Sequence, residues 1–109
     1  MDKYEIIITD DAVKELDDIC EYIADVLQAP KSALAYLKVI REAINKLETY
    51  PQRIAVVSEA PWGDYGVRRI VVKNFYIYFY VDMETNKVYI LNVIYARRDQ
   101  LKALQNMFM

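Results

Sequence analysis

Six cationic side chains in the second half of the chain have the types and spacing to bind a polyanion. Arginine forks match phosphate oxygens in two-pronged geometry, and a lysine adds a point charge. Two arginine pairs bracket residues 65–99, so positive charge would gather near the ends of the strands expected there. The cations are Arg68, Arg69, Lys73, Arg97, Arg98 and Lys102, and the sequence predicts that they form an RNA-binding or DNA-binding edge.

The alternative is that these cations pair with Asp64, Asp82 or Asp99 on the surface. Such exposed ion pairs contribute only about 0 to 1 kcal/mol. Neighbouring residues on a strand point to opposite faces, so Arg97 and Arg98 cannot both point inward. These two arginines are therefore favoured for binding.

Tyrosines add a second kind of binding surface. Tyr76, Tyr78 and Tyr80 alternate with apolar residues over 75–81, which predicts a strand with one tyrosine face. Stacking of a base on a ring contributes about 1 to 3 kcal/mol. Packing is the favoured reading, because a half-wet sheet face suits a ring with a polar tip. Tyr76 is retained as a candidate nucleic-acid contact.

Several kinds of chemistry are disfavoured by composition. Cys20 is the one cysteine and there is no histidine, so neither a Cys/His metal site nor a Cys-His nucleophile pair is available. Gly63 and Gly66 are the only glycines, which leaves no glycine-rich phosphate loop. We expect no metal and no cofactor.

Length and composition predict one globular domain spanning residues 1–109. The chain is 55% hydrophobic and 28% charged, and it has no apolar run near the roughly 18 residues that span a bilayer. The expected compartment is the cytoplasm. Residues 1–25 hold nine acids and two bases, whereas residues 26–109 hold seven acids and twelve bases. This asymmetry indicates an acidic flank and a basic working surface.

The first half of the chain reads as a strand followed by two helices. Residues 4–8 form a β-type run, and Thr9 with two aspartates then signals a helix start. Apolar residues recur at three- and four-residue steps up to Leu27, and a second helix from Pro30 ends at Tyr50-Pro51. The short link between the helices predicts an antiparallel hairpin that covers one sheet face.

The second half reads as a loop and three strands. Residues 52–66 are expected to form a surface loop with one short extended piece. Strands are expected over 67–73, 75–81 and 87–95, and their short links predict an antiparallel meander. Asp99 is a candidate cap for a last helix. The predicted fold is α+β: an N-terminal strand, an antiparallel two-helix hairpin on an antiparallel sheet of about four strands, and a short C-terminal helix.

The order of short motifs along the chain resembles the RelE/ParE superfamily of bacterial toxins from type II toxin–antitoxin pairs. The motifs are T-x-x-A, L-x-x-I-x-x-Y-I, L-x-x-Y-P, G-x-R, N-F-Y-I-Y-F-Y and Y-A-R-R-D. They occupy Thr9–Ala12, Leu16–Ile23, Leu47–Pro51, Gly66–Arg68, Asn74–Tyr80 and Tyr95–Asp99.

The resemblance implies a toxin neutralised by a cognate antitoxin that wraps it. In the RelE-like branch, the toxin cuts mRNA in the ribosome with an arginine in the strand at 75–81, a second arginine after the last strand, and often a tyrosine or histidine beyond. The ParE-like branch poisons DNA gyrase without comparable chemistry. Here the strand arginine falls at Tyr76, the later one at Arg97 or Arg98, and the last group near Ala103.

We therefore expect a cytoplasmic growth-inhibiting toxin, with ribosome-dependent mRNA cleavage favoured. The residues expected to act in catalysis are Arg97, Arg98 and Arg68, with RNA held by Arg69, Lys73, Lys102 and Tyr76. RNA cleavage also needs a group that accepts the 2′-OH proton. Two alternatives stay open: a gyrase inhibitor that breaks no bond, and a degenerate member that only binds its antitoxin. The expected partners are the antitoxin, with the ribosome and mRNA or gyrase, in a homodimer or a toxin–antitoxin hetero-oligomer, and no membrane.

Overall fold

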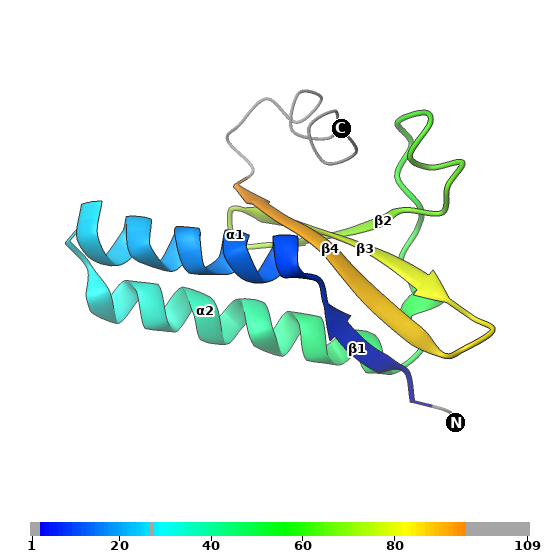
Figure 1. The fold of residues 1–109 in the computed structure, drawn as a ribbon, viewed down its shortest axis with the longest axis horizontal. Coiled ribbons are helices and arrows are strands. Elements are labelled where there is room, and N and C mark those ends of the chain that lie inside the picture. The colour runs from blue at the N-terminus through cyan, green and yellow to red at the C-terminus, as the bar shows by residue number, and fades with distance from the viewer. Residues whose placement is uncertain (1–2, 27, 96–109) are drawn as a thin grey trace.

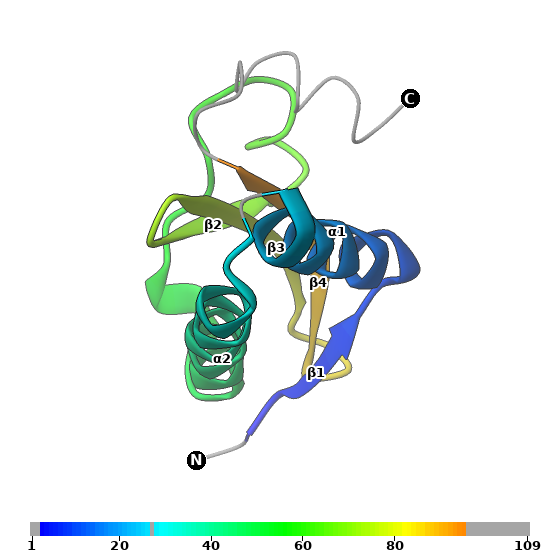
Figure 2. The same cartoon turned by 90° about the vertical axis from the view of Figure 1, so that its left-hand side faces the viewer.

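The computed structural model describes residues 3–26 and 28–95, which form two helices and a four-stranded sheet (Figure 1). Both helices lie on the same side of the sheet, as the end-on view in Figure 2 shows. The predicted strand, helical hairpin and sheet are therefore confirmed. In chain order the elements are β1 (Glu5–Ile8), α1 (Asp10–Glu21), α2 (Pro30–Asn45), β2 (Arg68–Val72), β3 (Phe75–Asp82) and β4 (Lys87–Tyr95).

The strand order across the sheet is β1-β4-β3-β2. The predicted meander is confirmed, because β2, β3 and β4 are antiparallel neighbours. The expectation of an entirely antiparallel sheet needs a correction, since β1 runs parallel to β4, from Glu5 opposite Lys87 to Ile8 opposite Ile90. Short links fix the direction of consecutive strands only. The helical hairpin separates β1 from the rest, so that rule does not apply to β1.

Helix boundaries follow local signals in the sequence. The Thr9 hydroxyl accepts a hydrogen bond from the Ala12 N–H at 3.3 Å, which caps α1, and two aspartates occupy its first turn. A π-helical turn at Tyr22–Val26 continues α1 toward the hairpin. Pro30 begins α2, where its missing N–H leaves no intrahelical partner unpaired. The helix then tightens into a 3-10 turn at Lys46–Glu48.

The main core lies between the sheet and the helices. Alternate β3 residues face the helical hairpin, and the apolar stripes of α1 and α2 pack against them, which confirms the predicted periodicity. The principal buried side chains are Ala12, Leu16, Ile40, Ile44, Phe75, Ile77, Phe79 and Val81.

A smaller core lies on the opposite face of the sheet, under the loop that precedes β2. Tyr78 is fully buried there with Val57 and Val67, and Trp62 packs against them. The half-wet tyrosine face expected from the sequence therefore holds for half-buried Tyr76 and for Tyr80, which is 41% exposed, but not for Tyr78. The loop makes the difference, because its apolar residues need a surface on which to bury.

Backbone contacts hold this loop against β2. The Val57 N–H donates to the Val67 carbonyl at 2.9 Å, and Val56 forms an isolated antiparallel bridge with Arg68. This is the short extended piece expected within 52–66. At Gly63 the chain passes so close to itself that an added Cβ would lie 2.2 Å from the Val57 carbonyl oxygen. Only glycine fits there.

Two further expectations concern a membrane-spanning helix and a last helix. Over residues 3–26 and 28–95, no helix is long and apolar enough to cross a membrane. The helix expected after Asp99 lies outside the described residues.

Candidate functional site

Arg68 and Arg69 begin β2, and the alternation of the strand sends them to opposite faces of the sheet. Arg68 lies opposite Phe79, on the face of the helices, and Arg69 lies opposite Tyr78, on the face of the loop. The two guanidinium groups therefore do not converge, although they are adjacent in sequence. Each forms its own set of contacts within the chain.

The half-buried Arg68 ties β2 to the segment that follows α2. Its Nη1 donates to the Gln52 carbonyl at 3.3 Å and also to the Ile54 carbonyl. Hydrogen bonds from a charged donor are stronger than neutral ones. Arg68 was predicted as a catalytic residue, and in this position its Nη1 is directed at backbone carbonyls.

Arg69 lies between a ring and a carboxylate on the loop face of the sheet. Its guanidinium carbon sits 4.7 Å from the centre of the Tyr76 ring, which is cation–π geometry. Its Nη1 is 3.8 Å from Glu59 Oε1, and the two side chains are 28% and 30% exposed. Two candidate nucleic-acid contacts, Arg69 and Tyr76, are thus brought together, and Glu59 of the loop partly neutralises the charge of Arg69.

Lys73 lies in the tight turn between β2 and β3. Its backbone has a φ of +55°, and its side chain is exposed. This turn adjoins the end of β4, because Phe75 pairs with Tyr95, the last described residue. Arg97, Arg98 and Lys102 follow in the sequence, outside the described residues. The catalytic role of Arg97 and Arg98 and the binding role of Lys102 stay predictions.

An apolar cleft of about 560 Å³ opens between the end of α1, the start of α2 and the sheet. Tyr36 meets Phe75 edge-on at 5.9 Å, and Phe75 lies 5.3 Å from Tyr95 between ring centres. Tyr22, which is 53% exposed, and Ile23 complete its apolar walls. The sequence reasoning did not identify this cleft, because its walls come from four separate elements.

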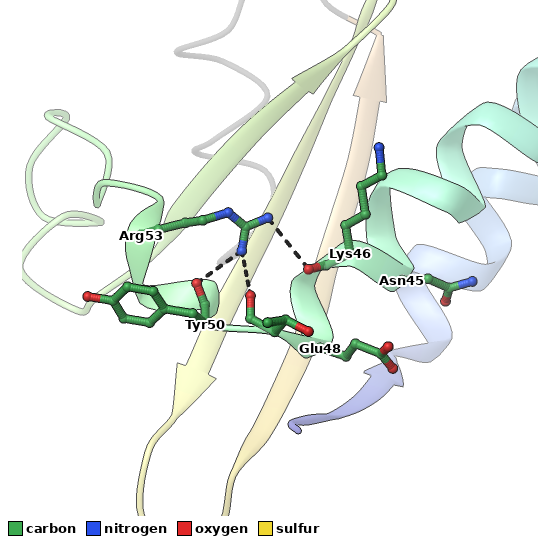
Figure 3. Close-up of a pocket in the computed structure, with 6 residues that line it drawn as sticks. Asn45, Lys46, Glu48, Tyr50 and Arg53 are labelled. Atoms are coloured by element: carbon green, nitrogen blue, oxygen red, sulfur yellow. Dashed lines mark hydrogen bonds between the residues drawn. The ribbon is translucent and has the colours of Figure 1, made fainter. Parts of the chain in front are cut away.

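A second hollow of about 640 Å³ lies at the C-terminal end of α2 and is shown in Figure 3. Arg53 donates there to the carbonyls of Thr49 at 2.7 Å and Tyr50 at 3.0 Å, and to that of Lys46 at 3.5 Å. A cation at the carbonyl end of a helix is favourable for the helix dipole. Arg53 was not among the predicted residues. The sequence signal that could have identified it is its position shortly after the C-terminal end of α2, where a cation can reach the last carbonyls.

The fold is that of the toxins in type II toxin–antitoxin systems. A structure of a chromosomal ParDE system from P. aeruginosa matches with a TM-score of 0.72 and 26% identity over 87% of this chain and 98% of that one. The toxin–antitoxin complex RelBE2 from Mycobacterium tuberculosis matches with a TM-score of 0.61 and 20% identity, over 87% and 93%. A mutant of E. coli toxin RelE in the free state matches with a TM-score of 0.61 and 13% identity, over 93% and 92%.

The sequence profile of the ParE toxin of the type II toxin–antitoxin system parDE matches residues 6–100. The chain therefore belongs to the ParE toxin family. This confirms the RelE/ParE resemblance drawn from the motifs and assigns the chain as a type II toxin. Among curated protein sequences, none matches it.

Proposed function

We propose that the chain inhibits growth by binding DNA gyrase in the cytoplasm, without breaking a bond in nucleic acid. The proposal rests on the ParE family match and on the gyrase inhibition that the superfamily resemblance implies for its ParE-like branch. The similarity to the ParDE structure from P. aeruginosa also supports it. This reverses the order of the two targets expected from the sequence.

The geometry around Tyr76 is the observation that carries this choice. In the RNA-cutting branch, the resemblance implies an arginine at that strand position, free to meet a phosphate. Here the position holds a tyrosine whose ring is covered by Arg69, and Arg69 also faces Glu59. The carboxylate repels a phosphate, and Arg68 is occupied by two carbonyls. This arrangement favours a surface that binds protein over one that cleaves RNA.

We also propose that a cognate antitoxin holds the toxin inactive. Similar structures include toxin–antitoxin complexes from M. tuberculosis and from Pyrococcus horikoshii. The antitoxin would cover the basic sheet edge and the apolar cleft beside Tyr36 and Phe75. An aromatic cleft of about 560 Å³ gives a partner apolar surface on which to bury its own side chains.

Ribosome-dependent mRNA cleavage remains the second candidate, favoured by one observation. Pairing of Phe75 with Tyr95 places the end of β4 beside Lys73 and near Tyr76. Arg97 and Arg98 follow directly in sequence. Lys73 and Tyr76 therefore lie near the strand end from which the sequence continues to Arg97 and Arg98, and such cations could hold RNA phosphates.

To test this, the toxin is expressed in cells either alone or together with its antitoxin. RNA 5′ ends are sequenced, and the purified toxin is added to gyrase in a supercoiling assay. We expect inhibited supercoiling and no new codon-phased RNA ends. Phased cuts that disappear in an Arg97→Ala/Arg98→Ala variant would instead establish the nuclease. Undisturbed growth would identify a degenerate member that only binds its antitoxin.

A further inference from the structure

The loop covers only part of the sheet face opposite the helices. Over β2 and the adjoining part of β3 it buries Tyr78, but the part of this face toward β1 carries a groove of about 380 Å³. In an antiparallel sheet with one solvated face, that face normally carries polar side chains. Here the lining is almost wholly aromatic and aliphatic: Thr9, Tyr65, Val67, Tyr80, Tyr89 and Leu91. We call it the tyrosine groove.

Three tyrosines from three elements form the walls of the tyrosine groove. Tyr80 and Tyr89 are directly opposed on β3 and β4, and Tyr65 approaches from the end of the loop. Tyr65 is 62% exposed and Tyr80 is 41% exposed. Rigid aromatic side chains with a polar tip are enriched among the residues that dominate protein–protein binding energy. The size of the groove suits one or two inserted side chains and is too small for a helix.

The rim of the groove is acidic. Two exposed carboxylates are sequence neighbours of lining residues, since Asp10 follows Thr9 and Asp64 precedes Tyr65. On the same face, Lys87 lies between Glu5 and Asp82 in the strand register, so these three residues together carry one net negative charge. A cationic group is therefore the electrostatic complement of the rim.

The same sheet face already shows how such a group would bind. Arg69 places its guanidinium over the Tyr76 ring, beside a loop carboxylate, at the far end of the face. The tyrosine groove repeats both components, rings and nearby carboxylates, and no cationic side chain is among the residues that line it. An arginine or lysine from another protein would complete it, with a cation–π attraction added to the burial of its aliphatic stem.

We infer that the tyrosine groove is a docking site for an arginine-bearing or lysine-bearing segment of the toxin's target protein. This inference rests on the proposed function, in which that target is DNA gyrase. It assigns the groove to the target, whereas the apolar cleft beside Phe75 is assigned to the antitoxin. The two proteins would then contact different faces of the toxin.

The test uses the full-length toxin, purified gyrase holoenzyme and the antitoxin. A Tyr65→Ser/Tyr80→Ser variant removes the two exposed rings, and Tyr50→Ser is the matched control, because Tyr50 is also 62% exposed but lies outside the groove. Loss of a dominant contact weakens binding by at least about tenfold, so we expect that change in gyrase inhibition for the double variant and none for the control. Circular dichroism and antitoxin affinity should be unchanged.

A charge variant tests the chemistry of the partner. Asp64→Lys should weaken gyrase inhibition, and the effect should shrink as salt is raised, because salt screens exposed charges. Unchanged inhibition by the tyrosine variant would overturn the inference, and so would a variant that loses antitoxin affinity while still inhibiting gyrase.

Growth inhibition separates this inference from the proposed function. If the wild-type toxin stops growth but does not bind gyrase, the proposed target is wrong, and the same variants are then scored for toxicity. Lost toxicity with intact antitoxin affinity would keep the groove as the docking site for another target. Retained toxicity, or a wild-type chain that does not affect growth, would overturn it.

Discussion

Glu15 in α1 accepts a hydrogen bond from the side-chain amide of Asn92 in β4, with Oε1 and Nδ2 3.0 Å apart. The same oxygen accepts the Val93 backbone N–H at 3.1 Å. Because β1 pairs with β4 only as far as Ile90, the helix carboxylate serves here as the partner that a longer strand would have supplied.

Replacement of Glu15 by leucine should therefore destabilise the fold. It would leave the Val93 N–H and the buried Asn92 amide without this acceptor, at a cost of about 1 to 3 kcal/mol. Urea unfolding measures the loss. Glu15→Gln keeps an acceptor oxygen and should lose less; equal losses in the two variants would show that the hydrogen bonds are not what matters.

Arg68 should contribute to stability through its bonds to the Gln52 and Ile54 carbonyls. Arg68→Ala is expected to lower the free energy of unfolding by about 1 to 3 kcal/mol, and Arg68→Lys should recover only part of it, because lysine keeps the charge but not the planar guanidinium. Urea unfolding of both variants is the measurement. A stable Arg68→Ala protein that has lost toxicity would instead place Arg68 in the functional site.

The Arg69 contacts predict which coupling is larger in double-mutant cycles. A cation–π contact of this kind contributes about 0.5 to 2 kcal/mol, whereas a partly exposed ion pair contributes about 0 to 1 kcal/mol. Coupling between Arg69→Met and Tyr76→Leu should therefore exceed coupling between Arg69→Met and Glu59→Gln in urea unfolding. The opposite order would mean that Glu59 is the main partner of Arg69.

Gly63→Ala should dislodge the loop from the sheet, since its new Cβ would meet the Val57 carbonyl oxygen at 2.2 Å. We expect the free energy of unfolding to fall by about 1 to 3 kcal/mol or more. Fluorescence of Trp62, the one tryptophan, reports the loop directly and should shift toward an exposed environment. Ser58→Ala, at an exposed position in the same loop, is the control and should change neither signal.

Asp82 gives a pH-dependent prediction. A side-chain hydrogen bond with Thr85 is the largest cause that lowers the pKa of this carboxyl, and backbone hydrogen bonds in the β3–β4 turn assist. A lowered folded-state pKa stabilises the fold above the unfolded pKa, and this contribution is lost as pH falls through the folded value. Asp82→Asn should therefore be less stable than wild type near neutral pH.

The difference between Asp82→Asn and wild type should vanish in acid. The measurement compares urea unfolding midpoints at about pH 7 and at about pH 2.5, because these two pH values bracket the ordinary pKa range of carboxyl groups. Thr85→Val, which removes the largest cause of the lowered pKa, should reduce the difference at neutral pH. A gap between Asp82→Asn and wild type that is the same at both pH values would rule out titration as its origin.

Local patterns were sufficient to predict most of the elements. Alternation over 75–81 predicted β3, the cap at Thr9 and Pro30 predicted the helix starts, and short links predicted the meander. Each of these signals acts over a few residues. The direction of β1 was not accessible in this way, because its partner is about eighty positions away and no short link joins them.

The site was harder to predict because its contacts depend on the loop. Nothing in the composition of 52–66 indicated that Glu59 would face Arg69 or that Tyr78 would be buried. The apolar cleft and the tyrosine groove likewise combine residues from several elements. Arginine identity was visible in the sequence, but the internal partners of Arg68 and Arg69 required the three-dimensional arrangement.

The pairing of β1 with β4 has a consequence for synthesis in the cell. The first strand of this toxin has no strand to pair with until residues 87–90 have emerged from the ribosome. Contacts between such distant parts of a chain form late and slowly. A nascent toxin would therefore stay incompletely folded until residues 87–90 have been synthesised.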